Sequence, residues 1–194
     1  MKPIVLLVTA PVLFLLACQP SAENQSNDLT SAPKDSTAAV AHGQYLVNTI
    51  GCNDCHTPKI FGPNGMQLDQ NLLLSGHQSG AALPAYDTVT SKSWILMYQH
   101  FTAFVGPWGT SFAGNLTPDP SGIGSWSEEQ FRKALREGKF KGMDNTRPLL
   151  PPMPWENFAQ LTDADIHDMF MYLKSIKPVY NVVPNPIPPV GTAQ

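Results

Sequence analysis

Two cysteines and a histidine stand at a spacing that suits one kind of chemistry. The residues are Cys52-Asn53-Asp54-Cys55-His56. Two thiols three positions apart match the separation of the vinyl groups along one edge of a haem, and the adjacent histidine can present its imidazole to the iron. The motif therefore predicts one covalently bound haem c, attached through Cys52 and Cys55, with His56 as the proximal iron ligand.

Two other chemistries use paired cysteines. A thioredoxin-like dithiol follows a strand, whereas the residues before Cys52 predict a helix. A structural zinc site needs two further ligands at matched spacing, and the sequence has no second cysteine pair, because its remaining cysteine is Cys18. Both chemistries fit the sequence less well than haem attachment.

Several residues compete for the sixth position on the iron. Met153 lies in Pro151-Pro152-Met153-Pro154, where prolines restrict the backbone and lower the entropy of the unfolded loop. Because a rigid extended loop can hold a thioether at a defined distance from an iron, we expect Met153 to be the distal ligand. Met143 is the next candidate. Other thioether and imidazole candidates are Met66, Met97, Met169, Met171, His42, His77, His100 and His167.

Ligation by a histidine and a methionine leaves no open position on the iron. A thioether favours the reduced iron and raises the reduction potential relative to two histidines. We therefore expect electron transfer and not an enzyme. An iron with an open distal site would instead suit a haem enzyme or a redox or gas sensor, which is the alternative function.

The segments around these residues have helical patterns. Apolar residues in 40–50 recur at helical spacing, and Gly51 is expected to end that helix before the motif. Ser127 and Gln130 have the spacing of a capping box, for a helix that Gly138 ends. These elements predict a helical domain around the haem motif.

A last helix is expected after Thr162, with acidic residues in its first turn. Its apolar stripe places Met169 in the core. The stripe consists of Ile166, Met169, Phe170 and Leu173.

The N-terminus has the pattern of an export signal. Lys2 precedes an apolar run over residues 4–16 that is too short to be a comfortable membrane span. Leu15-Leu16-Ala17-Cys18 resembles a bacterial lipobox, which predicts a signal peptide over 1–17 and a lipid on Cys18. The same resemblance to bacterial lipoproteins implies sorting to the outer membrane, because the residue after the cysteine is Gln19 and not Asp, with the protein facing the periplasm.

Composition divides the rest of the chain. Residues 18–38 are polar without an apolar period, and are expected to be a flexible linker spanning roughly 25 Å. Residues 39–180 are expected to be the haem domain, in which 57–113 form an extended loop region. Residues 181–194 predict a proline-rich tail. The net charge of −3, without a basic face, argues against a nucleic-acid partner.

Several of these segments together resemble one haem domain of the cytochrome c subunits of bacterial membrane-bound alcohol, gluconate and aldehyde dehydrogenases. The matching segments are 43–47, 51–58, 114–119, 122–129, 149–155, 161–165 and 172–173, of which Gly114-Asn115-Leu116-Thr117-Pro118-Asp119 is among the most distinctive.

The resemblance implies an all-α, class I cytochrome c-like haem domain with a long loop insertion. In that fold the first and last helices cross, so we also expect the small Gly43 to contact Tyr172. The resemblance also implies thioether attachment at Cys52 and Cys55, ligation by His56 and Met153, and redox partners such as a dehydrogenase, an oxidase or another cytochrome. Those subunits usually carry three haem motifs and this chain has one, so a subunit role does not follow from the resemblance.

Overall fold

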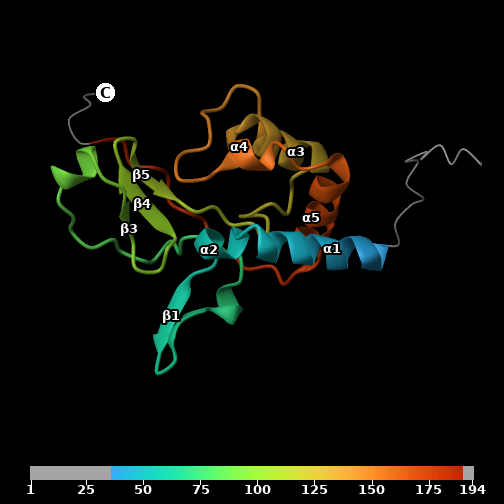
Figure 1. Ribbon diagram of the computed structural model, residues 1–194, viewed down its shortest axis with the longest axis horizontal. Coiled ribbons are helices and arrows are strands. Elements are labelled where there is room, and N and C mark those ends of the chain that lie inside the picture. Colours follow the sequence, from blue (N-terminus) through green and yellow to red (C-terminus); the bar gives the residue numbers. More distant parts are fainter. Residues whose placement is uncertain (1–35, 190–194) are drawn as a thin grey trace, which may run out of the picture. The chain divides into compact units, whose positions relative to one another are not determined.

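The computed structural model describes residues 36–189. Cys18, the predicted signal peptide, most of the predicted linker and residues 190–194 lie outside the described residues. Within residues 36–189 the chain forms five α-helices, three short 3₁₀ helices and five strands in two antiparallel sheets (Figure 1). None of the helices in this part of the chain is long and apolar enough to cross a membrane.

The prediction of an all-α fold is wrong, because residues 57–113 contain two sheets. Strand β1 (Lys59–Gly62) pairs with β2 (Gly65–Leu68). Strands β3 (Leu96–Met97), β4 (Ala103–Gly106) and β5 (Gly109–Phe112) form a second sheet in that order. Along the chain, the 3₁₀ helices η1 (Gln70–Leu72) and η2 (Thr90–Lys92) come after the first sheet and before the second. A third 3₁₀ helix, η3 (Phe140–Gly142), follows later in the chain. The domain therefore has mixed helix and strand content.

Two similar turns explain the hairpins. Both have the sequence Gly-Pro-x-Gly, at residues 62–65 and 106–109, and in both the two glycines are directly paired. Proline restricts the backbone at the turn, and the last glycine adopts a positive φ, 85° at Gly65 and 94° at Gly109. Within residues 57–113, which were expected to form an extended loop region, these glycines and prolines mark the turns between paired strands.

Helix α1 (Ser36–Thr49) leads into the short helix α2 (Cys52–His56), which carries the haem motif. Gly51 separates them with a φ of 82°, in the left-handed region that glycine adopts without steric cost. The predicted break before the motif is therefore confirmed.

The first and last helices pack closely at Gly43. Helix α5 (Asp163–Ser175) packs against α1, and the two helices cross in Figure 1. A Cβ atom on Gly43 would collide with the backbone carbonyl of Asp168 and lie 2.9 Å from the Cβ of Tyr172. Next to this contact, His42 Nδ1 lies 2.7 Å from Asp168 Oδ2. The expected contact between Gly43 and Tyr172 is confirmed.

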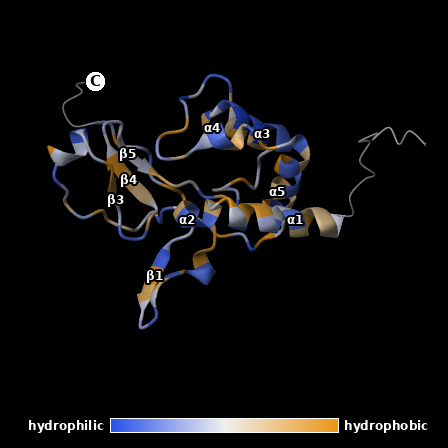
Figure 2. Ribbon diagram, viewed as in Figure 1, coloured by the Kyte–Doolittle hydropathy of each residue, from blue (hydrophilic) through white to orange (hydrophobic). Residues whose placement is uncertain are grey.

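Helix α3 (Glu128–Glu137) completes the helical part of the core. Ser127 and Gln130 form the predicted capping box, and Gly138 ends the helix with a φ of 62°. Phe131 and Leu135 face inward, while most of the helix surface is hydrophilic (Figure 2). The buried apolar core consists of Val47, Leu74, Ile123, Phe131, Leu135, Ile166, Met169, Phe170, Tyr172 and Leu173.

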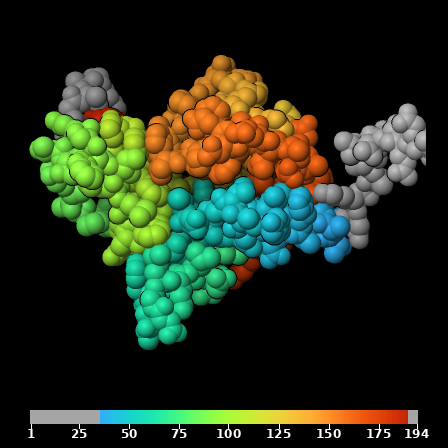
Figure 3. All heavy atoms as spheres, in the orientation of Figure 1, coloured from blue at the N-terminus to red at the C-terminus, as the bar shows by residue number. Residues whose placement is uncertain are grey.

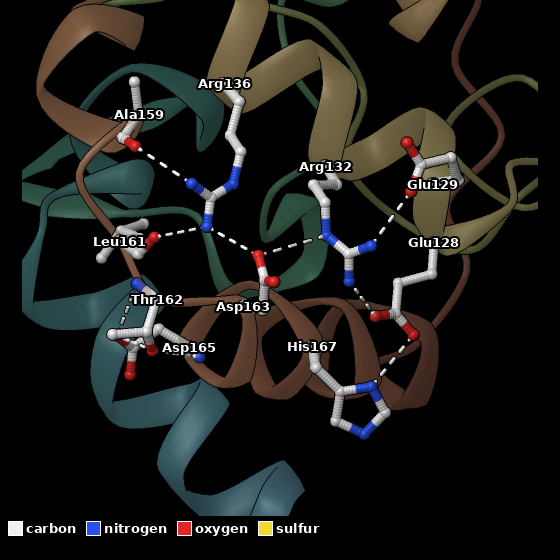
Figure 4. A network of polar contacts seen from close by, with 10 residues as sticks. All are labelled: Glu128, Glu129, Arg132, Arg136, Ala159, Leu161, Thr162, Asp163, Asp165 and His167. Atoms are coloured by element: carbon white, nitrogen blue, oxygen red, sulfur yellow. Dashed lines mark hydrogen bonds and ion pairs between the residues drawn. The ribbon is translucent and has the colours of Figure 1, made fainter.

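A polar network connects α3 to the segment that joins α4 (Trp155–Phe158) to α5 (Figure 4). Arg136 donates to the Leu161 carbonyl at 2.8 Å and to Asp163 Oδ1 at 2.7 Å. Arg132 reaches Glu128 and Glu129 within its own helix. Exposed ion pairs of this kind each contribute little to stability. The main effect of the network is that Arg136 holds the α4–α5 connection against α3.

The segment after α5 packs beside the second sheet. Thr110 of β5 and Ile187 exchange two backbone hydrogen bonds, at 2.8 and 3.0 Å. Strand β5 is thus paired with β4 on one side and with residue 187 on the other. The β1–β2 hairpin, by contrast, lies at the surface, with Ile60, Phe61 and Met66 exposed (Figure 3).

Candidate haem site

Helix α2 carries both cysteines of the motif as half-buried free thiols. Burial raises the pKa of Cys52 to about 12 and also raises the pKa of Cys55. Both thiols therefore stay protonated at neutral pH. Zinc binding and disulfide exchange both need a thiolate, which functional sites favour by lowering the cysteine pKa. The surroundings of these thiols favour neither of the two alternative chemistries.

The imidazole of His56 is held in one orientation. Its Nδ1 donates to the backbone carbonyl of Gly114 at 2.7 Å, which leaves the lone pair on Nε2. Burial lowers the pKa of His56, so the ring is neutral at pH 7. Within residues 36–189, Nε2 has no hydrogen-bond partner. A neutral ring fixed through its other nitrogen is the form in which histidine binds a metal.

The carbonyl that orients His56 belongs to a rigid polar turn. The side-chain oxygen of Asn115 accepts hydrogen bonds from the Thr117 backbone at 2.9 Å and from the Thr117 hydroxyl at 2.8 Å. The Asn115 amide donates to the Val179 carbonyl at 2.9 Å. The backbone N–H of Leu116 donates to the Leu74 carbonyl at 2.8 Å. The segment 114–119 therefore has a structural role, because it places the acceptor for His56.

Asn181 fastens the segment after α5 to the same region. This side chain is 3% exposed, and its amide donates to the carbonyls of Ser75 and His77 at 2.8 Å each. Its oxygen accepts from the Ser79 backbone at 3.0 Å. Sequence reasoning missed this residue, because an asparagine near prolines carries no signal of its distant partners.

Replacing Asn181 by alanine is expected to lower the free energy of unfolding by about 1–3 kcal/mol, because two buried backbone carbonyls and the backbone N–H of Ser79 lose their partner. Urea unfolding followed by circular dichroism measures this difference. Asn185→Ala is the control, since Asn185 is exposed in the same segment. Equal midpoints for the two variants would contradict the structural role of Asn181.

The loop that carries Met153 is anchored at several points. The Leu149 N–H donates to the Gly138 carbonyl at 2.6 Å, and the Ser111 hydroxyl donates to the Pro151 carbonyl at 2.6 Å. The Trp155 ring packs directly on Gly138, where a Cβ would collide with it. Met153 is half-buried against the apolar core cluster, which Cys52 also contacts. The loop and the haem motif therefore border the same core.

The other candidate ligands have different surroundings. His77 uses both ring nitrogens, with Nδ1 accepting from Thr102 at 2.9 Å and Nε2 donating to the Ala81 carbonyl at 3.3 Å. His100 donates from Nδ1 to the Lys59 carbonyl at 2.5 Å and accepts at Nε2 from Gln99 at 3.3 Å.

Two of the alternative methionines are also placed unfavourably. Met169 is 2% exposed within the core, as the sequence predicted, while Met143 is 44% exposed. Of these four alternatives to Met153, the two histidines are committed to protein partners and the two methionines lie in the core or at the surface. Among these five residues, Met153 is the one that is both anchored and half-buried beside the motif-bearing core.

Comparison with known proteins finds similarity to the cytochrome c subunits of bacterial dehydrogenases. The chain is 43% identical over 75 residues to the cytochrome c subunit of an alcohol dehydrogenase (quinone) from Gluconobacter oxydans, covering 38% of this chain and 15% of that protein. It is 28% identical over 174 residues to the gluconate 2-dehydrogenase cytochrome c subunit of Pantoea cypripedii, covering 89% and 29%. No family model matches the chain.

The chain is therefore a homologue of the cytochrome c subunits of bacterial dehydrogenases, and covalently bound haem c is the cofactor that this homology implies. A further relative is one of the subunits of nicotinate dehydrogenase from Pseudomonas putida, 40% identical over 150 residues, or 77% of this chain and 10% of that protein. The chain spans less than a third of the length of each of these relatives, at most 29%.

Proposed function

We propose that this chain is a membrane-tethered cytochrome with one haem c. It would pass electrons from a dehydrogenase or a quinol-linked donor to an oxidase or a soluble carrier. In this proposal Cys52 and Cys55 hold the haem through thioethers, and His56 and Met153 are its axial ligands. Bound haem supplies reversible one-electron chemistry.

The observation that carries the proposal is the orientation of His56. Its Nδ1–H is held by the Gly114 carbonyl, so the neutral Nε2 is available on the same short helix as both thiols. Gly114 is in turn fixed by the polar turn around Asn115 and Thr117. A rigid support of this kind keeps the ring in place in both oxidation states, so little rearrangement accompanies electron transfer.

The Met153 loop supports an iron whose sixth coordination position is filled. Its contacts to Gly138 and Ser111 hold it near the apolar core without help from the methionine itself. A loop that is already positioned loses little entropy when its thioether binds a metal. We infer that the anchored loop lets Met153 occupy the sixth position of the iron. An occupied sixth position favours an electron carrier over an enzyme or a gas sensor.

The membrane tether is proposed from the sequence alone. A lipid on Cys18 and the polar residues that follow it would hold the domain at the periplasmic side of the outer membrane. Redox encounters are small and transient, and a tether compensates by raising the local concentration near a membrane-bound partner. Relatives named as dehydrogenase subunits support a dehydrogenase as one such partner.

Replacing Met153 by alanine is expected to remove the weak long-wavelength sulfur-to-iron band from the optical spectrum of the oxidised, haem-loaded protein. The variant should also bind carbon monoxide when reduced, because its sixth position is open. Absorption spectra of the oxidised and reduced forms, with and without carbon monoxide, measure both effects.

Met143→Ala is the matched control, because Met143 is an exposed methionine ten positions earlier and should leave the band in place. If the wild-type protein lacks the band, or binds carbon monoxide readily when reduced, the assignment of Met153 fails. The alternatives of a haem enzyme or a redox or gas sensor would then take precedence.

A further inference from the structure

A buried lysine follows the haem motif by three positions. Lys59 is only 5% exposed. Its ammonium donates to three backbone carbonyls, those of Asn53 at 3.1 Å, Asp54 at 2.9 Å and Thr57 at 2.5 Å. All three acceptors belong to helix α2 or to the residue directly after it.

These hydrogen bonds satisfy the end of a very short helix. The last carbonyls of an α-helix have no partner within the helix, and α2 has only five residues. A cation at this end is favourable because the carbonyls there carry partial negative charge. Lys59 therefore ties together the C-terminal end of the segment that carries Cys55 and His56.

The number of hydrogen bonds also indicates the charge of Lys59. An ammonium has three N–H donors and no acceptor, so three carbonyl partners use it completely. A neutral amine would have only two donors and would point a lone pair at the third carbonyl. Burial lowers the pKa of Lys59 from its ordinary value, but the three acceptors favour the protonated form.

Residues of the turn between β3 and β4 pack against Lys59. The Phe101 ring centroid lies 5.7 Å from Lys59 Nζ, in the range of a cation–π contact. The imidazole of His100 donates to the Lys59 backbone carbonyl. Within residues 36–189 no carboxylate lies within ion-pair distance of Nζ, although the Asp54 carboxylate acts on the ammonium from farther away and partly offsets the lowering of the pKa of Lys59 by burial. The groups in direct contact with the buried ammonium are therefore neutral.

We propose that Lys59 is a positioning residue for the haem motif and that its fixed positive charge raises the reduction potential of the haem. The inference rests on the proposed attachment of haem at Cys52 and Cys55. Reduction adds one electron to the site, and a nearby buried cation stabilises the form that holds the extra electron. Because the surroundings of Lys59 are poorly hydrated, its charge is screened less than that of a surface lysine.

The test is a redox titration of the haem-loaded full chain, followed by absorbance. Lys59→Met and Lys59→Gln remove the charge, and at the wild-type midpoint potential each is expected to lower the ratio of reduced to oxidised protein about tenfold. For one electron this corresponds to a shift of about 59 mV to lower potential. Lys59→Arg retains the charge and should stay much closer to the wild-type midpoint.

Lys92→Met is the matched control, since it removes one positive charge from an exposed position. Its midpoint should equal that of the wild type. If Lys59→Met and Lys59→Gln bind haem covalently but keep the wild-type midpoint, or if Lys92→Met shifts it as much as they do, the inference about Lys59 is overturned while the proposed function stands. If the wild-type chain does not hold haem covalently, the proposed function itself fails.

A failure of the neutral variants to fold is also informative. Should they yield no haem-loaded protein while Lys59→Arg does, a positive charge is required to hold α2, which supports the positioning role. Should Lys59→Arg fail in the same way, the requirement is for the shape of lysine and not for its charge, and the inference is overturned.

Discussion

A variant with both Cys52 and Cys55 replaced by alanine is expected to lose all of its haem when the protein is denatured. The wild-type chain should retain its haem through denaturation, because two thioether bonds hold it regardless of the fold. Haem staining after denaturing electrophoresis, together with the mass of the intact chain, measures this difference. The expected effect is complete loss of haem from the denatured chain, which is the largest effect of any change proposed for this site.

Met153→Ala is the appropriate comparison for this experiment. It removes a proposed axial ligand but neither attachment point, so its haem should remain on the denatured chain. Haem that stays with the chain after both cysteines are removed would show that another residue forms the covalent bond. Haem that leaves the denatured Met153→Ala variant would show that the two cysteines do not hold it covalently.

Gly43→Ala is expected to reduce the free energy of unfolding by about 3 kcal/mol, at the upper end of overpacking effects. The new Cβ would collide with the backbone carbonyl of Asp168 on the facing helix, and backbone cannot move aside as a flexible side chain can. The helices α1 and α5 would have to separate, which disturbs the core next to the haem motif. Thermal or urea unfolding measures the loss.

The direction of the change in stability distinguishes a close helix contact at Gly43 from an open position. In an open position within a helix, alanine is more stable than glycine by roughly 0.5–1 kcal/mol. Gly80→Ala, in a turn outside the helices, serves as a control for the substitution itself, because nothing lies within 4 Å of the position that its Cβ would occupy. A neutral or stabilising effect of Gly43→Ala would mean that the two helices are not in contact at this residue.

The three longer helices, α1, α3 and α5, were predictable because their signals are local. Apolar spacing and Thr162 identified α5, and Gly51 identified the break before α2. For these elements the information lies within a few residues of the helix it determines. The contact of Gly43 with Tyr172 was predicted differently, from the resemblance to a fold in which the first and last helices cross.

The two sheets were missed because their pairing depends on partners elsewhere in the chain. Strands of two to four residues are too short for an alternating pattern to stand out. The signal that could have found them is the pair of Gly-Pro-x-Gly turns at 62–65 and 106–109. Read as turns between short extended segments, and not as loop composition, they indicate two antiparallel hairpins.

The candidate site was predictable in part. The spacing of the motif identifies Cys52, Cys55 and His56 directly, and their roles as attachment points and ligand remain predictions. The supporting residues were not predictable in this way. Gly114 acts through a backbone carbonyl that any residue has, and Lys59 is a charged side chain that burial alone distinguishes from a surface lysine.

The pairing of Thr110 with Ile187 has a consequence for how the protein behaves in concentrated solution. An uncovered strand at the edge of a sheet offers a row of N–H and C=O groups that can bind the same edge of another molecule, which is a common start of aggregation. At β5 the C-terminal segment already occupies that position in the same chain. Residues near 187 thus cover this edge of the sheet and protect it against self-association. An affinity tag should therefore be added after these residues and should not replace them.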